Sequence, residues 1–285
     1  MERYTLGLYE KSMPSSLSLA EKLTVASEAS YDYIELSIDE TDEKLNRLSW
    51  DHSERKGLLD AMDSIGIRIR SICLSGHRKY PLGHPDFAVR QRSMAIMCDA
   101  ICLASDLGIR LIQIAGYDVY YVPSSEESKK RFAENIAIAV EVAAREGVIL
   151  AFETMETPFM DTTAKAMHWV HEMDSPYLQV YPDTGNVTNA AALYGTTLEA
   201  DLGTGHGHLA ALHLKESNPG VYREVPYGHG HVDFKEATKV ALSLGVRMFV
   251  GEFWYTGEED WRNLLKENGL FLRSALKEGE KALGL

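Results

Sequence analysis

The segment Val148-Ile149-Leu150-Ala151-Phe152-Glu153 joins a continuous apolar run to a carboxylate at its end. A run that is apolar at every position is typical of a parallel strand covered by helices on both faces. Three later segments follow the same rule and end in Asp183, His213 and Glu252. The four end residues are separated by 30, 30 and 39 residues, about one strand-helix unit each.

The same alternation of strand and helix extends over the whole chain. Strands are predicted at residues 4–9, 32–38, 67–74, 109–116, 148–153, 178–183, 209–214 and 247–252, and helices at 17–29, 53–65, 87–107, 126–146, 162–173, 190–201, 233–244 and 258–282. This pattern predicts an α/β fold, a single (β/α)8 TIM barrel over residues 1–285, because such barrels typically take about 250 residues. A doubly wound open sheet is the alternative, but no GxGxxG or GxxxxGK[ST] motif follows any predicted strand.

Composition limits the classes of partner. The formal net charge is −13, which argues against nucleic acid as a partner because phosphate backbones require an excess of Lys and Arg. The three cysteines, Cys73, Cys98 and Cys102, form no periodic framework and favour reduced thiols. No signal sequence opens the chain and no apolar run reaches 18 residues, so we expect a cytoplasmic protein that does not contact a membrane.

The four end residues predict a metal site. The carboxyl ends of parallel strands meet at one face of a barrel, so Glu153, Asp183, His213 and Glu252 should converge there. Three carboxylates and one imidazole suit one divalent ion: Mn²⁺, Mg²⁺ or Co²⁺, with Zn²⁺ also possible. Glu153 and Glu252 are the candidate catalytic residues, one on each side of a substrate. One would remove a proton beside a polarised carbonyl, and the other would return a proton to the opposite face.

Several segments resemble the L-ribulose-5-phosphate 3-epimerase (L-xylulose-5-phosphate 3-epimerase) family of the xylose-isomerase-like barrels. They are Gly7-Leu8-Tyr9-Glu10-Lys11, Glu35-Leu36-Ser37-Ile38-Asp39-Glu40-Thr41-Asp42, Ser71-Ile72-Cys73-Leu74-Ser75-Gly76-His77-Arg78, Gln113-Ile114-Ala115-Gly116-Tyr117-Asp118-Val119-Tyr120-Tyr121, Tyr181-Pro182-Asp183-Thr184-Gly185-Asn186 and His213-Leu214-Lys215-Glu216. The resemblance covers residues 4 to about 255. It implies a cytoplasmic isomerase of pentose or ascorbate catabolism that inverts C3 of a ketopentose 5-phosphate through an enediolate. It also implies the same four metal ligands and the same pair of Glu residues.

Further residues are candidates for binding the substrate, and all follow predicted strands. Gly228 and Gly230 lie where barrels often offer backbone N–H groups to a phosphate. Lys215 is expected to point to the same face as His213. Its partner there is either a substrate oxygen or an acidic side chain in a structural salt bridge. The remaining candidates are His77, Arg78, Tyr117 and Glu156.

Three alternatives keep the barrel but change the activity. The first is an aldose–ketose isomerase of a related sugar or a hydroxypyruvate-type compound. The second, phosphodiester cleavage of the endonuclease IV type, is disfavoured by the acidic balance. The third is a sugar-phosphate-binding barrel without catalysis, against which the four intact ligands argue. A homodimer is a further expectation.

Overall fold

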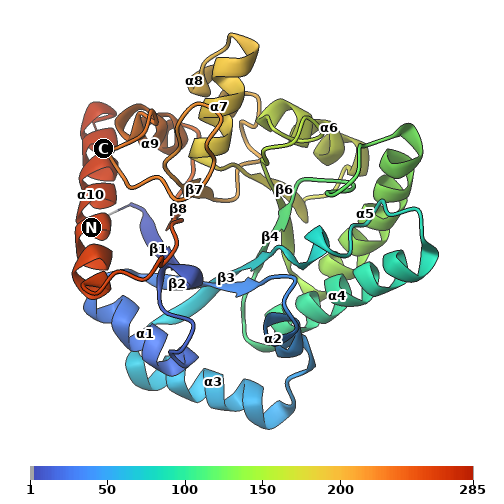
Figure 1. The fold of residues 1–285 in the computed structure, drawn as a ribbon, viewed down its shortest axis with the longest axis horizontal. Coiled ribbons are helices and arrows are strands. Elements are labelled where there is room, and N and C mark those ends of the chain that lie inside the picture. The colour runs from blue at the N-terminus through green and yellow to red at the C-terminus, as the bar shows by residue number, and fades with distance from the viewer. Residues whose placement is uncertain (1–2, 285) are drawn as a thin grey trace.

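The computed structural model describes residues 3–284 and forms a ring of parallel strands surrounded by helices (Figure 1). The strands are β1 (Thr5–Tyr9), β2 (Tyr33–Ile38), β3 (Arg68–Leu74), β4 (Leu111–Ala115), β5 (Ile149–Glu153), β6 (Leu178–Tyr181), β7 (Leu212–Leu214) and β8 (Met248–Gly251). The longer helices are α1 (Leu19–Glu28), α3 (His52–Ile65), α4 (Phe87–Asp106), α5 (Glu126–Glu146), α6 (Thr163–Met173), α7 (Thr184–Tyr194), α9 (Phe234–Ser243) and α10 (Trp261–Ala282). Shorter turns are η1 (Glu10–Ser12), α2 (Asp42–Leu45), η2 (Asn46–Ser49), η3 (Gly76–Arg78) and α8 (Leu198–Gly203).

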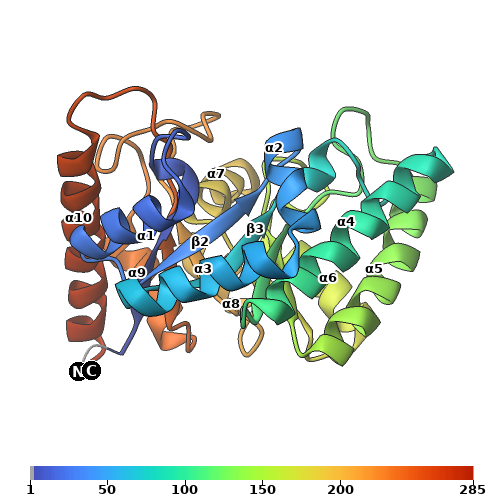
Figure 2. The ribbon, with the colours of Figure 1, turned by 90° about the horizontal axis from the view of Figure 1, so that it is seen from below.

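The strands pair in the order β6-β5-β4-β3-β2-β1-β8-β7, and every ladder is parallel. Isolated bridges between Val180 and Leu209 and between Asp183 and His213 connect β6 to β7 and almost close the ring. This confirms the predicted (β/α)8 barrel. The loops that follow the strands gather at one end of the ring, where a barrel carries its active site (Figure 2).

Helix ends follow the local chemistry of the sequence. Ser18 and Asp51 begin α1 and α3 with reciprocal capping boxes, in which the side chain of a Glu three residues later returns a hydrogen bond. Gly66 and Gly147 end α3 and α5 at φ +82° and +67°, a conformation that residues with a Cβ avoid. Within residues 3–284, none of the helices combines the length and apolarity needed to cross a membrane.

One predicted helix, 190–201, is wrong in its bounds. The chain turns into α7 at Thr184, directly after β6, because the Asp183 carboxylate accepts the N–H of Asn186 as an N-cap. Gly195 then ends α7 in the left-handed conformation, and Thr197 caps the separate helix α8. The Gly-Thr-Thr sequence therefore divides the predicted helix into two shorter ones.

A buried carboxylate ties the first third of the barrel together. Glu10, immediately after β1, is fully buried and accepts hydrogen bonds from Lys22 Nζ at 2.9 Å and Lys44 Nζ at 2.7 Å. Arg47 and the backbone N–H of Ser37 complete its partners. Burial would raise the pKa of Glu10, but the hydrogen bond and charge of Arg47 and the charges of the two lysines outweigh it and hold the pKa well below its usual value. The carboxylate thus joins β1 and β2 to α1, α2 and η2.

Glu10→Gln should lower the free energy of unfolding by about 3–5 kcal/mol at pH 7, because it leaves three buried cations without their counter-charge. The folded-state pKa of Glu10 is depressed, so its contribution is complete above the unfolded pKa of about 4.3 and is lost as the pH falls further. Urea denaturation at several pH values should show the difference between variant and wild type shrinking in acid.

Glu43→Gln is the matched control. Glu43 approaches the same Lys44 at 3.7 Å, but its side chain is 70% exposed, so its removal should cost less than about 1 kcal/mol. Equal losses in the two variants would contradict the assigned role of Glu10.

Candidate active site

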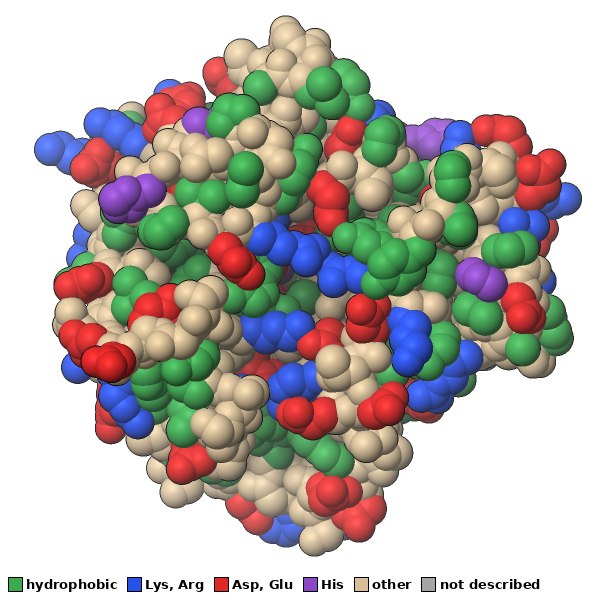
Figure 3. Space-filling view, viewed as in Figure 1, with side chains coloured by type: hydrophobic (Ala, Val, Ile, Leu, Met, Phe, Trp, Pro, Cys, Tyr) green, Lys and Arg blue, Asp and Glu red, His purple; other side chains and the backbone are tan. Residues whose placement is uncertain are grey.

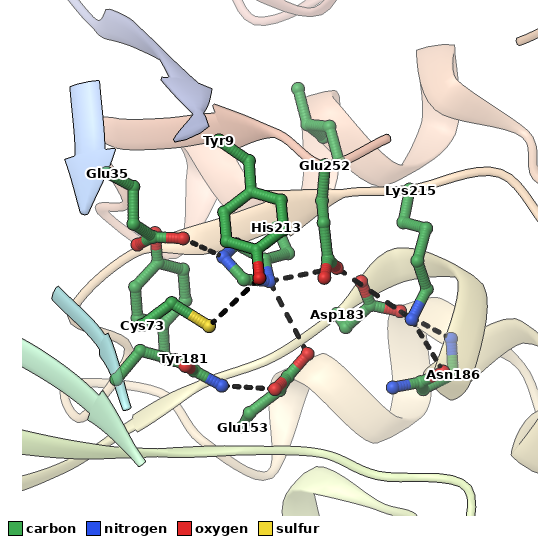
Figure 4. A network of polar contacts seen from close by, with 12 residues as sticks. Tyr9, Glu35, Cys73, Glu153, Tyr181, Asp183, Asn186, His213, Lys215 and Glu252 are labelled. Atoms are coloured by element: carbon green, nitrogen blue, oxygen red, sulfur yellow. Dashed lines mark hydrogen bonds and ion pairs between the residues drawn. The ribbon is translucent and has the colours of Figure 1, made fainter. Parts of the chain in front are cut away.

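Four side chains converge where β5, β6, β7 and β8 end. Glu153 is the last residue of β5, and His213 is the middle residue of β7. Asp183 lies two residues after the end of β6, and Glu252 immediately follows β8. All four are buried, and one ligand atom from each can be chosen so that all lie within 4.8 Å of one another (Figure 4). The structure therefore brings together the four residues that the strand pattern predicts as ligands.

Glu35, in the middle of β2, orients the imidazole ring of His213. His213 Nε2 lies 2.6 Å from Glu35 Oε1, and both side chains are fully buried. The other oxygen of Glu35 accepts hydrogen bonds from Ser71 Oγ at 2.7 Å and Tyr181 OH at 2.9 Å. With Nε2 directed to Glu35, Nδ1 faces the other members of the group (Figure 4).

The free atoms of the group fit a metal ion. His213 Nδ1 lies 3.1 Å from Glu252 Oε2 and 3.4 Å from Glu153 Oε1. His213 Nδ1, Asp183 Oδ2 and Glu252 Oε2 make no aligned hydrogen bond to any residue the structure describes, although all three are buried. Buried acceptors without partners are costly, and a hard divalent cation would satisfy all three at once. Glu153, Asp183, His213 and Glu252 could therefore hold such an ion.

Asp183 has one occupied oxygen and one free oxygen. Its Oδ1 accepts the backbone N–H of Asn186 at 2.7 Å and lies 3.0 Å from Lys215 Nζ. Oδ2 is the unpartnered atom. The residue that caps α7 thus also turns one oxygen toward the group.

The two Glu residues differ in their electrostatic surroundings. Burial and the charge of Glu252 raise the pKa of Glu153. Burial acts on Glu252 in the same direction, but His213 and Lys215 outweigh it and lower the pKa of Glu252. Burial likewise raises the pKa of Asp183, to about 7, although Lys215 opposes the shift. Carboxylates whose pKa values are driven apart can serve as acid and base at the same pH.

A narrow cavity leads from the group to solvent. Its free volume is about 60 Å³, and a neighbouring cavity of about 420 Å³ shares Lys215, Glu252 and Trp254 as walls. Glu156 crosses the opening: it accepts Tyr120 OH at 3.0 Å and lies 3.5 Å from an Arg223 nitrogen. Lys, Arg, Asp and Glu side chains surround the hollow at this face (Figure 3). Glu156 and Arg223 thus form an ion pair among the residues that line the narrow cavity.

Of the predicted substrate-binding residues, Arg78, Glu156 and Lys215 line this cavity. Arg78 stacks over the Tyr120 ring at 4.9 Å, which presents a cation at the opening. Tyr117 lies behind this layer, buried, with its ring 5.1 Å from that of Tyr120. His77 packs away from the cavity: it is buried, its Nε2 lies 3.2 Å from the carbonyl oxygen of Ser93 on α4, and burial lowers its pKa to about 4.

Gly228 and Gly230, the predicted phosphate donors, lie in the loop after β7 and close to Glu216. The N–H of Gly228 donates to Glu216 Oε2 at 3.0 Å, so it is not free for a ligand. A Cβ on Gly230 would lie 2.1 Å from the carbonyl oxygen of Ser217, so this position packs against the strand end. The hydrogen bond from Gly228 and the close approach of Gly230 place the loop after β7 against the Glu216 carboxylate.

Sequence reasoning missed the residues that support the site. Glu35 orients His213, Gln113 Nε2 donates to Glu153 Oε2, and Asn186 accepts from Lys215 at 2.9 Å. A signal existed for two of them, because Glu35 and Gln113 each place a large polar side chain inside a strand that is mostly apolar. A polar side chain inside such a strand requires a buried partner.

Comparison with known proteins agrees with this geometry. The family model described as "Xylose isomerase-like TIM barrel" matches residues 23–275. A protein of Escherichia coli O157:H7 named L-ribulose-5-phosphate 3-epimerase UlaE is 40% identical over 90% of this chain and 89% of its own. The protein of that name from Salmonella heidelberg is 43% identical over 84% of this chain and 83% of its own. A solved structure of an L-ribulose 3-epimerase has the same fold, with a TM-score of 0.80 and 17% identity over 99% of this chain and 97% of that one. The chain therefore belongs to the xylose isomerase-like TIM barrels and, within them, to the family of the L-ribulose-5-phosphate 3-epimerases.

Proposed function

We propose that this protein interconverts L-ribulose 5-phosphate and L-xylulose 5-phosphate by moving a proton at C3. The relatives that are 40% and 43% identical carry the name of this activity. The observation that carries the proposal is that two buried Glu residues, at the ends of β5 and β8, both approach His213 Nδ1, at 3.4 Å and 3.1 Å (Figure 4). A group of this kind can act on both faces of one carbon.

One divalent ion, held by Glu153, Asp183, His213 and Glu252, is part of the proposal. When bound, such an ion supplies Lewis acidity that polarises the carbonyl of the ketose and acidifies the neighbouring C–H. The chain supplies the hard oxygen ligands and directs His213 Nδ1 toward them. Their composition suits Mn²⁺, Mg²⁺, Co²⁺ or Zn²⁺.

Proton transfer falls to Glu153 and Glu252. The one in its ionised form removes the C3 proton, leaving an enediolate, and the other, protonated, returns a proton to the opposite face. His213 and Lys215 favour the ionised form of Glu252, whereas burial and Glu252 favour the protonated form of Glu153. Gln113 fixes the orientation of Glu153 through its amide. The reverse reaction exchanges the two roles.

The cavity walls supply the remaining contacts. Lys215 lies beside Asp183 in the cavity wall, and Asn186 accepts a hydrogen bond from it. Arg78 and Glu156 lie at the opening, where they can meet the far end of the sugar phosphate. Closure of the Glu156–Arg223 pair would exclude water during proton transfer.

Glu153→Gln and Glu252→Gln should each reduce kcat by about 10²–10⁴-fold, because each removes one of the two proton carriers while keeping an oxygen ligand. Rates are to be measured at saturating Mn²⁺ and substrate, with circular dichroism to verify the fold. Asp161→Asn is the matched control, since Asp161 is a buried carboxylate that pairs with Lys165 outside the cavity. Its kcat should stay close to the wild-type value, and wild-type turnover by either Gln variant would remove that residue from proton transfer.

Solvent exchange identifies the reacting carbon. In D₂O, the enzyme should place deuterium at C3 of both sugar phosphates, because the proton returned by the second Glu comes from solvent-exchangeable carboxyl groups. Proton NMR of the C3–H signal follows the exchange directly. Deuterium at C1 alone would instead indicate an aldose–ketose isomerase.

Glu35→Gln should weaken binding of Mn²⁺ by about 10–100-fold, because the variant loses the charge that orients and polarises the His213 ring. Isothermal titration of the metal-stripped protein measures this affinity. Tyr181→Phe is the control: it removes one hydroxyl donor to Glu35 and leaves the Glu35–His213 contact in place, so its effect should be much smaller. Unchanged affinity in Glu35→Gln would show that this contact does not support the ion.

A further inference from the structure

Lys215 is a buried cation placed directly against the metal-binding group. Its side chain is 6% exposed, and Nζ lies 3.0 Å from Asp183 Oδ1 and 3.8 Å from Glu252 Oε2. Burying an ammonium group is costly unless its hydrogen bonds and charge are satisfied. A cation is also an unexpected neighbour for residues that attract a second cation, so its placement requires an explanation.

The first turn of α7 forms a cradle for this lysine. Thr184 Oγ1 accepts the N–H of Lys215 and donates to its carbonyl oxygen, both at 2.9 Å. Gly185 leaves the space for the lysine stem, because a Cβ there would lie 3.2 Å from Lys215 Cε. Asn186 Oδ1 accepts from Nζ at 2.9 Å. Asp183 and Asn186 contact the ammonium and Thr184 holds the backbone of Lys215, so the ammonium position is fixed by the local structure (Figure 4).

This arrangement determines how Asp183 can act. Its Oδ1 is engaged by Lys215 and by the N–H of Asn186, so only Oδ2 remains free. Lys215 also brings one positive charge to within 3.0 Å of Asp183 and 3.8 Å of Glu252, next to the carboxylates that would hold the ion. Negative charge in excess around an ion strengthens its binding but weakens its pull on electrons of a bound carbonyl.

We propose that Lys215 is a positioning residue that keeps Asp183 a one-oxygen ligand and lowers the affinity for the ion in favour of turnover. The inference rests on the proposed function, because it concerns the ion and the enediolate of that reaction. The proposal predicts two opposite effects of removing Lys215: metal binding should become tighter, and catalysis should become slower. A lysine that only stabilised the fold would weaken both when removed.

The test compares Lys215→Met and Lys215→Gln, which are neutral, with Lys215→Arg, which keeps the charge. Metal-stripped proteins are titrated with Mn²⁺ alone by calorimetry, and kcat and KM are then measured at saturating Mn²⁺ with L-ribulose 5-phosphate. We expect the neutral variants to bind Mn²⁺ at least about tenfold more tightly than wild type and to lose at least about tenfold in kcat. Lys215→Arg should return the Mn²⁺ affinity toward the wild-type value.

Lys165→Met is the matched control, because Lys165 also pairs with a buried carboxylate, Asp161, but lies outside the cavity. Its Mn²⁺ affinity should equal that of wild type. One neutral Lys215 variant that folds is sufficient for the test. Mn²⁺ binding by that variant that is equal to or weaker than binding by wild type would overturn the proposal. Because the titration contains no substrate, this outcome is distinct from failure of the proposed reaction, which would appear as absence of epimerisation by the wild-type enzyme.

Discussion

The hydrogen bond between Glu35 and His213 is the contact on which the rest of the site depends. It spans the interior of the barrel from β2 to β7 and fixes the imidazole so that Nδ1 faces Glu153 and Glu252. A ring rotated by half a turn would direct its carbon atoms at the carboxylates and leave the group without its nitrogen ligand. Tyr181 and Ser71 saturate the second oxygen of Glu35, so the carboxylate itself has little freedom to turn. The orientation is thus set inside the barrel, before any ligand arrives.

The parallel ring explains why residues far apart in sequence lie together in one group. Each strand delivers its last side chains to the same face, and the β6–β7 bridge between Asp183 and His213 places these two neighbours in register. Glu153 and Glu252 come from strands separated by β6 and β7 in the ring, yet both carboxylates reach His213 Nδ1. The difference in their surroundings, with Lys215 and His213 favouring ionised Glu252, distinguishes the two carboxylates electrostatically.

Sequence alone was sufficient for features that repeat along the chain and insufficient for those that depend on packing across it. Continuous apolar runs ending in Glu153, Asp183, His213 and Glu252 predicted the barrel. They also predicted the cluster of these four residues at one end of it, since strand ends converge in any such ring. The helix after β6 was misplaced because the capping of α7 by Asp183 competes with an apparent turn sequence. Gly228 was interpreted as a phosphate donor, yet its N–H is used by Glu216, a partner 12 residues away that no periodicity reveals. Glu35 stands out as a charge inside a buried strand, but its partner, 178 positions later, could not be predicted for the same reason.

The net charge of the chain and the charge of its cavity have opposite consequences for an anionic substrate. A formal charge of −13 would repel a sugar phosphate at long range, but that repulsion is screened beyond about 8–10 Å at physiological ionic strength. Within this distance the cavity presents Lys11, Arg78, Lys215 and Arg223 among its walls. Lys215 is held by Asp183 and Asn186, whereas the Arg78 guanidinium faces the opening over Tyr120 and is available to an incoming anion. Local donors, fixed by neighbouring acids and aromatic rings, therefore outweigh the global charge in determining what can bind.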